Sequence, residues 1–316
     1  MKKIILYNPA ISSMNLGDEI ISESCKQNLD KLFDSDMYIE ISTHLPVNNN
    51  YLKRIKDVRY SFVLGSNLLM PKLDARFRQW DIKMWNVDYM KPVILMGVGW
   101  NRYSTKTTIY TKNLYKKLLS KEYIHSVRDS YTEQKLKEIG INNVINTGCP
   151  TFWNLTKEHC KDISKIKSDK VVCTLTDYKK DFEKDKKLFE ILKRNYKEIY
   201  FWPQGSDDYE YFKQMNIHNI HVIPPYLKEF DNILKTKVDY IGTRLHGGIR
   251  ALQYKCRSII LAVDNRATEL NKDYNIPVIQ RNDIDKLDDK INKELITDII
   301  LPNENIKKWK RQLLKL

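Results

Sequence analysis

Short apolar segments alternate along almost the whole chain with longer segments whose apolar residues recur at helical spacing. This alternation constrains the fold most, because strands that are separated by helices assemble into a parallel, doubly wound sheet. In the first half, the predicted helices are 19–32, 76–85, 111–119 and 131–139. The predicted strands are 4–7, 38–42, 61–64, 93–98, 124–128 and 144–146.

A second series of strands follows a polar, lysine-rich segment, 156–170, which we interpret as a linker. At 316 residues the chain is about twice the usual domain length. We therefore expect two Rossmann-like α/β domains facing a cleft, a GT-B-like architecture, with domains 1–158 and 159–316. The terminal helix, 304–316, is expected to dock back on the first domain. The predicted strands of the second series are 171–175, 199–202, 220–223, 238–241 and 258–263.

Several classes of protein are disfavoured by composition. No apolar run is long enough to span a membrane, and the apolar start at 4–6 is too short for a secretory signal, so a cytoplasmic protein is expected. The five cysteines are scattered without paired spacing, which indicates neither a disulfide framework nor a zinc site. The six histidines also lack metal-ligand spacing, and no metal is expected.

The chain is basic, with 54 lysines and arginines against 40 acids and a net charge of +14. Such a charge favours anionic partners: nucleic acid, anionic membrane surfaces or phosphorylated substrates. The lysines are spread along predicted helical faces and no nucleic-acid motif accompanies them, so nucleic acid is not an expected partner.

Residues 242–248 place an arginine and a histidine in a turn between a predicted strand and helix. Ligands bind at such turns in open parallel sheets, and Arg244 and His246 would offer a fixed positive charge beside a proton donor. Gly247 and Gly248 would let a ligand approach the helix amides. The alternative is a plain helix start in which Arg244 is solvated and His246 caps or packs.

Two loops in the first half carry further candidates. Asn15 and Asp18 could bind sugar hydroxyls, although Asp18 could equally cap a helix while Gly17 supplies an unusual backbone angle. Trp100 and Arg102 form an aromatic and basic loop suited to stacking on a sugar, although loop aromatics often anchor the loop itself.

Other strand ends carry arginines. Arg128 could hold a carboxylate or phosphate with two parallel hydrogen bonds, or form a local ion pair with Asp129. Asn265 and Arg266 follow a strand in the second half and add an amide and a second cation. Surface loops could hold all of these residues without any ligand.

Taken in order, five motifs of the chain resemble those of the polysaccharide pyruvyl transferase family. The resemblance spans nearly the whole chain, and its most specific part is the Arg-Leu-His element combined with the early Asn-x-Gly-Asp loop. The motifs are Asn15-Leu16-Gly17-Asp18, Val127-Arg128-Asp129, Gly148-Cys149-Pro150-Thr151, Arg244-Leu245-His246 and Asp264-Asn265-Arg266.

The resemblance implies a GT-B-like enzyme of cell-surface polysaccharide biosynthesis, such as capsule or exopolysaccharide. Such an enzyme moves a pyruvyl group from phosphoenolpyruvate, a donor substrate and not a cofactor, onto two hydroxyls of a sugar as a cyclic ketal. On this reading Arg244 and His246 are catalytic, and His246 delivers a proton to the enol carbon. The donor contacts are Arg128, Leu245, Gly247, Gly248, Asn265 and Arg266, and the acceptor contacts are Asn15, Gly17, Asp18, Trp100 and Arg102.

The first domain would take the acceptor and the second the donor. A lipid-linked glycan is a candidate acceptor, and its use would bring the basic protein to the anionic inner face of the membrane. Two positions depart from the family pattern: Gly65-Ser66-Asn67 stands where a run of glycines is common, and Arg266 stands where lysine is expected.

Two other functions stay open on the sequence. A GT-B glycosyltransferase using a nucleotide sugar would share the architecture, but the second half lacks paired glutamates and the first loop lacks a histidine base. A non-catalytic glycan-binding or membrane-surface scaffold would fit the basic charge and the 19 tyrosines.

Overall fold

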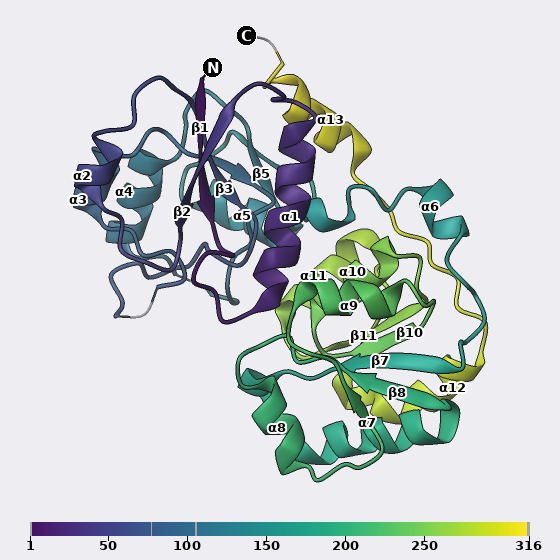
Figure 1. Ribbon diagram of the computed structural model, residues 1–316. Coiled ribbons are helices and arrows are strands. Elements are labelled where there is room, and N and C mark those ends of the chain that lie inside the picture. The colour runs from purple at the N-terminus through teal and green to yellow at the C-terminus, as the bar shows by residue number, and fades with distance from the viewer. Residues whose placement is uncertain (1, 77, 105, 315–316) are drawn as a thin grey trace. The chain divides into compact units, whose positions relative to one another are not determined.

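The computed structural model describes residues 2–76, 78–104 and 106–314. They divide into two compact units: unit 1 comprises 2–13, 21–153 and 302–314, and unit 2 comprises 14–20 and 154–301, apart from the residues outside the description. Each unit is built on parallel strands joined by helices (Figure 1). The α/β class predicted from the alternation is therefore confirmed.

In unit 1, four parallel strands form one sheet in the order second, first, third, fourth, and the last two strands pair in a second sheet. A parallel bridge joins Val98, just after the fourth strand, to Val127 in the fifth. The strands are β1 (Lys3–Asn8), β2 (Met37–Ser42), β3 (Val58–Leu64), β4 (Ile94–Met96), β5 (His125–Val127) and β6 (Val144–Asn146). The helices are α1 (Leu16–Asp30), whose first residues belong to unit 2, α2 (Asn49–Leu52), α3 (Met84–Val87), α4 (Ile109–Leu118), α5 (Ser130–Glu138), the short 3-10 turn η1 (Pro150–Phe152) and α13 (Asn303–Arg311).

The C-terminal helix α13 packs on unit 1. The ring of Trp309 is fully buried and lies 6.0 Å from Phe62 and 5.8 Å from Trp153, centroid to centroid. Lys310 Nζ donates to Asn28 Oδ1 of α1 at 2.7 Å, and the two helices lie side by side in Figure 1. Apolar burial and this polar contact hold the end of the chain on the first sheet. The last two residues of the predicted terminal helix lie outside the described residues.

The predicted helix 76–85 is wrong over the residues that the structure describes, where only α3 is helical. Trp80 and Ile82 are fully buried, so their apolar spacing reflects core packing of an irregular segment. The backbone N–H of Asp81 donates to Thr43 O at 2.8 Å, a long-range hydrogen bond that replaces a helical one.

Unit 2 contains one six-stranded parallel sheet. Its strands are β7 (Lys170–Thr174), β8 (Glu198–Phe201), β9 (His221–Val222), β10 (Asp239–Gly242), β11 (Ser258–Ala262) and β12 (Val278–Gln280), in the order β12-β11-β10-β7-β8-β9. The strands β7, β8 and β10 lie next to one another, so the loops that follow them meet at one edge of the sheet. That edge carries the polar site described below.

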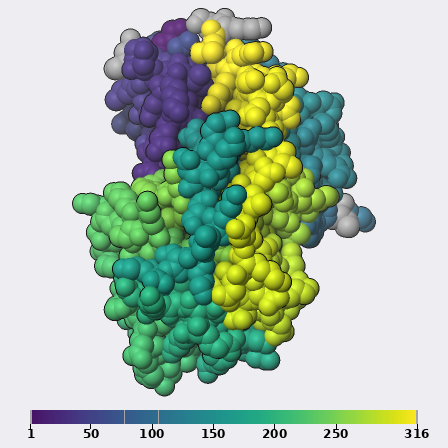
Figure 2. All heavy atoms as spheres, turned by 90° about the vertical axis from the view of Figure 1, so that its right-hand side faces the viewer, coloured from purple at the N-terminus to yellow at the C-terminus, as the bar shows by residue number. Residues whose placement is uncertain are grey.

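The helical segments of unit 2 include two that the sequence reading missed, one in the predicted linker and one near the end. The first is α6 (Lys157–Lys161), and the second is η3 (Arg281–Lys286) with α12 (Leu287–Asn292). The backbone of Leu295 donates to Lys165 O at 3.0 Å, so the segments around these residues run side by side, in teal and yellow in Figure 2. The others are η2 (Asp177–Lys179), α7 (Phe182–Asn195), α8 (Asp208–Gln214), α9 (Leu227–Leu234), α10 (Leu245–Gln253) and α11 (Asn265–Tyr274).

Within the part of the chain that the structure describes, none of the helices combines the length and apolar character needed to cross a membrane.

A buried histidine in β5 makes the stability of the fold depend on pH. His125 is fully buried, its Nδ1 accepts from the backbone N–H of Leu95 at 3.2 Å, and its Nε2 lies 2.9 Å from Ser120 O. These contacts fit a neutral ring protonated at Nε2. Burial lowers the pKa of His125 to about 4, although the contact with Ser120 O opposes the shift.

We expect His125 to make the protein less stable as the pH falls. Because the folded pKa lies below the ordinary value of 6.5, the unfolded chain binds the proton more readily, so stability is lost between about pH 6.5 and pH 4. The loss attributable to this group is about 3 kcal/mol. Urea unfolding across that range, compared with His125→Gln, measures it. Equal pH slopes for the two proteins would contradict the assignment.

Candidate active site

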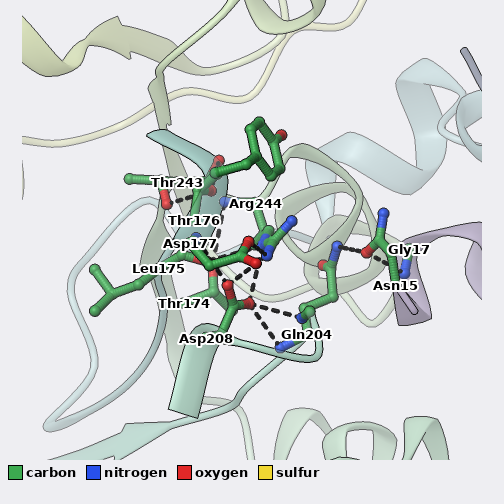
Figure 3. A network of polar contacts seen from close by, with 12 residues as sticks. Asn15, Gly17, Thr174, Leu175, Thr176, Asp177, Gln204, Asp208, Thr243 and Arg244 are labelled. Carbon is green, nitrogen blue, oxygen red and sulfur yellow. Dashed lines mark hydrogen bonds and ion pairs between the residues drawn. The ribbon is translucent and has the colours of Figure 1, made fainter. Parts of the chain in front are cut away.

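A buried arginine lies where the loops after β7, β8 and β10 meet (Figure 3). Arg244 follows β10, has an extended backbone and immediately precedes α10. Its residue exposure is 4%, and its Nε donates to Leu175 O at 2.8 Å. The strand-to-helix turn predicted from the sequence is therefore present, and Arg244 is buried, which contradicts the alternative in which it is solvated.

Asp208 is the main partner of Arg244. Its Oδ2 accepts from Arg244 Nε at 3.0 Å, and its Oδ1 pairs with Arg244 Nη2. Three backbone N–H groups also donate to this fully buried carboxylate: Gly205 at 2.7 Å, Asp177 at 3.0 Å and Gln204 at 3.1 Å. One side chain thus ties together the loops after three neighbouring strands.

A second acid, Asp177, contacts the same guanidinium. Its Oδ1 lies 2.7 Å from Arg244 Nη2, and its side chain is 17% exposed. Among the described residues, Nη1 of Arg244 has no hydrogen-bond partner, and one guanidinium nitrogen points away from the two acids in Figure 3. Burial would lower the pKa of Arg244, but Asp208, Tyr178 and Asp177 raise it above its ordinary value.

A glycine makes room for this arrangement. A β-carbon on Gly205 would overlap Arg244 Nη2 and would lie 3.0 Å from the guanidinium carbon. Because Arg244 is buried and held by two acids, it could not move aside without breaking those contacts. The Trp-Pro-Gln-Gly sequence after β8 therefore needs its glycine for a close approach.

Arg266 forms a second cluster beside the first. It pairs with Asp264, the N-cap of α11, and with the hydroxyl of Tyr178. The ring of Tyr178 lies close to both arginines, with its centroid 5.2 Å from the Arg244 guanidinium carbon and 5.6 Å from that of Arg266. Arginine fits where lysine was expected because its planar group can bind a carboxylate and stack on a ring together. Asn265 opens α11 and is partly buried.

The first turn of α10 carries the other predicted donor residues. Leu245, His246, Gly247 and Gly248 are all buried. A β-carbon on Gly248 would overlap Ile260 of β11, so this glycine lets the helix pack closely on the sheet. A β-carbon on Gly247 would lie 3.1 Å from Gln204 Oε1, a tight contact.

The loop before α1 also reaches this edge of unit 2. Asn15 Oδ1 accepts from Gln204 Nε2 at 2.8 Å and from the N–H of Gly17 at 3.0 Å, so Asn15 caps the helix, not Asp18. A β-carbon on Gly17 would lie 2.7 Å from Gln204 Nε2. Gln204 Oε1 is buried and has no hydrogen-bond partner among the described residues. Asp18 is buried in the first turn.

Unit 1 holds a separate buried arginine. Arg128, which follows β5 and is 1% exposed, donates to Asp129 Oδ2 and to Asn67 Oδ1, both at 3.2 Å. Its Nη1 is buried and has no hydrogen-bond partner among the described residues. A β-carbon on Gly99 would overlap the guanidinium group. Asn67, which departs from the family's glycine run, thus supplies a side-chain partner for Arg128.

The loop after β4 differs from the prediction. Trp100 is fully buried in the core of unit 1, its N–H donates to Thr132 Oγ1, and its Nε1 donates to Ser104 Oγ. Its ring therefore anchors the loop and does not face solvent as a surface for a sugar. Arg102 is exposed.

The acids of the site were not predicted from the sequence. Asp177 and Asp208 are the first residues of the helical segments that follow β7 and β8, a position near the strand ends that favours ligand or network residues. That placement is the one signal that could have identified them. In the described part of the chain, no group of three or more histidines, cysteines and acids is arranged to hold a metal ion.

Comparison with known proteins adds two findings. The sequence model of the family described as polysaccharide pyruvyl transferase matches residues 15–265. Among curated proteins, no significant sequence match was found.

Two solved structures are similar over their whole lengths. The UDP-GlcNAc 2-epimerase of Methanocaldococcus jannaschii, in complex with UDP-GlcNAc and UDP, is 15% identical with a TM-score of 0.56, covering 99% of this chain and 98% of that one. MnaA of S. aureus, in a co-structure with UDP, is 12% identical with a TM-score of 0.51, covering 100% and 98%. At these identities the likeness shows the fold alone, and it confirms the predicted GT-B-like class.

Proposed function

Because the chain belongs to the polysaccharide pyruvyl transferase family, we propose that it transfers a pyruvyl group from phosphoenolpyruvate onto two hydroxyls of a sugar. The product is a cyclic ketal, and phosphate is released. The proposed role is in the biosynthesis of a cell-surface polysaccharide.

The proposal is supported above all by the two residues at the start of α10. There a buried arginine, whose Nη1 has no hydrogen-bond partner among the described residues, stands two residues before a buried histidine, His246. Phosphoenolpyruvate has a phosphate and a carboxylate, which match the forked N–H donors of Arg244. Arg128 is the candidate anion contact in unit 1, since its buried Nη1 also lacks a partner in the part of the chain that the structure describes.

In the proposed reaction, His246 as an imidazolium gives its proton to the methylene carbon of the donor, which becomes a methyl group. The positive charge that develops on C2 is attacked by one sugar hydroxyl, whose proton returns to His246. The second hydroxyl then forms its bond to C2 as the C–O bond to phosphate breaks. Its proton leaves with the phosphate, so atoms and charge balance.

The test is phosphate release from phosphoenolpyruvate by the purified protein with a panel of glycan acceptors, with the product identified by mass spectrometry. We expect release only when donor and acceptor are both present. His246→Gln should lower the rate at least about a hundredfold, because general acid catalysis contributes about 10² to 10⁴. His218→Gln, at an exposed position, is the matched control. Full activity of His246→Gln would exclude the proposed role.

A nucleotide-sugar enzyme is the second candidate, because the similar epimerase structure contains UDP-GlcNAc and UDP. A thermal-shift comparison separates the two. Stabilisation by uridine or guanosine diphosphate but not by phosphoenolpyruvate would favour the second candidate.

A further inference from the structure

We propose that Asp177 occupies a place on Arg244 that the anionic donor takes over, whereas Asp208 is the permanent partner that positions the guanidinium. Asp177 would then be a built-in competitor that sets how tightly the donor binds. The identity of the donor rests on the proposed function, but the exchange itself rests on the geometry of the two acids.

The guanidinium group of Arg244 can bind a pair of oxygen atoms at two places. Its five N–H bonds lie in one plane and form two forks, one on the side that includes Nε and one at the end between Nη1 and Nη2. Asp208 fills the side fork, because its two oxygens pair with Nε and Nη2. Asp177 contacts Nη2 alone, at 2.7 Å, and Nη1 has no partner among the described residues. The end fork is therefore only half used.

Asp208 is held too firmly to be displaced from Arg244. It is fully buried, and three backbone N–H groups converge on its carboxylate besides Arg244. Displacing it would leave these donors and the buried cation without partners, which is strongly unfavourable. Asp208 is accordingly a positioning residue that fixes the plane in which the end fork lies.

Asp177 is held by fewer contacts and can be displaced from Arg244. Its side chain is 17% exposed, and Arg244 is its one hydrogen-bond partner among the described residues. Its backbone N–H is anchored to Asp208 Oδ1 at 3.0 Å, and the neighbouring Thr176 Oγ1 lies 2.8 Å from Thr243 Oγ1. The carboxylate can therefore swing into solvent while the loop stays in place.

The charges around Arg244 favour an anionic ligand in this exchange. With both acids in contact, two carboxylates face one guanidinium, and this excess of negative charge opposes an anion. Once Asp177 has left, the end fork offers two parallel N–H donors that fit two oxygens of a carboxylate or phosphate. A neutral sugar cannot compensate for the lost ion pair, so the exchange selects an anionic ligand.

The test measures binding of phosphoenolpyruvate, and separately of inorganic phosphate, by titration calorimetry to the full chain. Asp177→Asn keeps the shape of the side chain and removes its charge, and we expect it to bind phosphoenolpyruvate about fivefold more tightly. Arg244→Lys should weaken binding, because it removes the fork. The unfolding temperature of each variant is measured alongside.

The matched control is Asp231→Asn. Asp231 is also paired with an arginine, Arg250, and is 15% exposed, but it lies on α9 against α10 and not at the strand ends. It should leave the affinity unchanged. If Asp177→Asn binds as tightly as the wild type, or less tightly, while Arg244→Lys binds more weakly, the exchange is refuted.

The two proposals fail in different ways. If the wild type binds no phosphoenolpyruvate, the proposed function is wrong. The exchange is then decided by inorganic phosphate, which Asp177→Asn must still bind more tightly than the wild type. If neither protein binds phosphate, the exchange at Arg244 is wrong as well.

Discussion

Replacing Asp208 with alanine should lower the free energy of unfolding by about 4 kcal/mol, since removing one partner of a buried ion pair leaves the other charge uncompensated. Arg244, at 4% exposure, would lose its principal partner, and three backbone N–H groups would lose their acceptor. Urea unfolding at pH 7 measures the loss. The carboxylate holds three loops, so the unfolding cooperativity is followed as well.

Two further variants show whether the loss comes from the stranded charge. Arg244→Met in the Asp208→Ala background removes that charge, and it should recover part of the lost stability. Asp231→Ala removes an acid from the more exposed pair with Arg250 and should cost about 1 kcal/mol. Equal losses for Asp208→Ala and Asp231→Ala would contradict the central place of Asp208.

The sequence predicted the two α/β units because the hydrophobic period that defines strands and helices is local. The same pattern misled at 76–85, where the apolar residues are buried in an irregular segment that is held by a long-range hydrogen bond to Thr43. Local spacing shows which residues are buried, but not which backbone conformation buries them.

The candidate site divides in the same way. Arg244 was identified from its place in a strand-to-helix turn, but its acids are 36 and 67 residues away along the chain, and no local signal pairs them. Trp100 was expected to face a sugar because it stands in a loop, whereas its exposure is decided by packing in the core. The polar contacts of the site depend on tertiary structure.

Arg128 is compatible with both interpretations of its sequence position, the anion contact and the local ion pair with Asp129. It makes the local ion pair with Asp129, yet its Nη1 remains buried and unpaired among the described residues. An unpaired buried cation nitrogen is unfavourable unless a ligand completes it. Arg257 Nε is also buried without a hydrogen-bond partner among the described residues, so Arg128 is included in the proposed donor contacts because of the family motif together with this nitrogen.

Arg128→Met should therefore lower kcat/KM for phosphoenolpyruvate about a thousandfold, because losing a buried charged contact to an anionic substrate costs about 4 kcal/mol. Its stability should fall as well, because Asp129 loses its buried ion-pair partner, although the Thr132 N–H and hydroxyl still donate to that carboxylate. Steady-state kinetics and urea unfolding of the same preparation measure both. Arg257→Met is the control: that buried arginine pairs with Asp239 and three backbone carbonyls, so its loss should lower stability without a matching loss of kcat/KM.

Gly99→Ala tests the same contact without removing the charge. The new β-carbon would overlap the Arg128 guanidinium, which must move from Asn67 and Asp129. Since a displacement of about 1 Å can lower a rate about a hundredfold, the variant should lose most of its activity. Its stability is measured alongside, because the buried ion pair with Asp129 is disturbed. Strong loss of activity in both Arg128→Met and Gly99→Ala, measured where each variant is folded, would place the orientation of Arg128 in the reaction. Full activity in Gly99→Ala would show that only the charge matters, or that Arg128 serves the fold alone if Arg128→Met is active too.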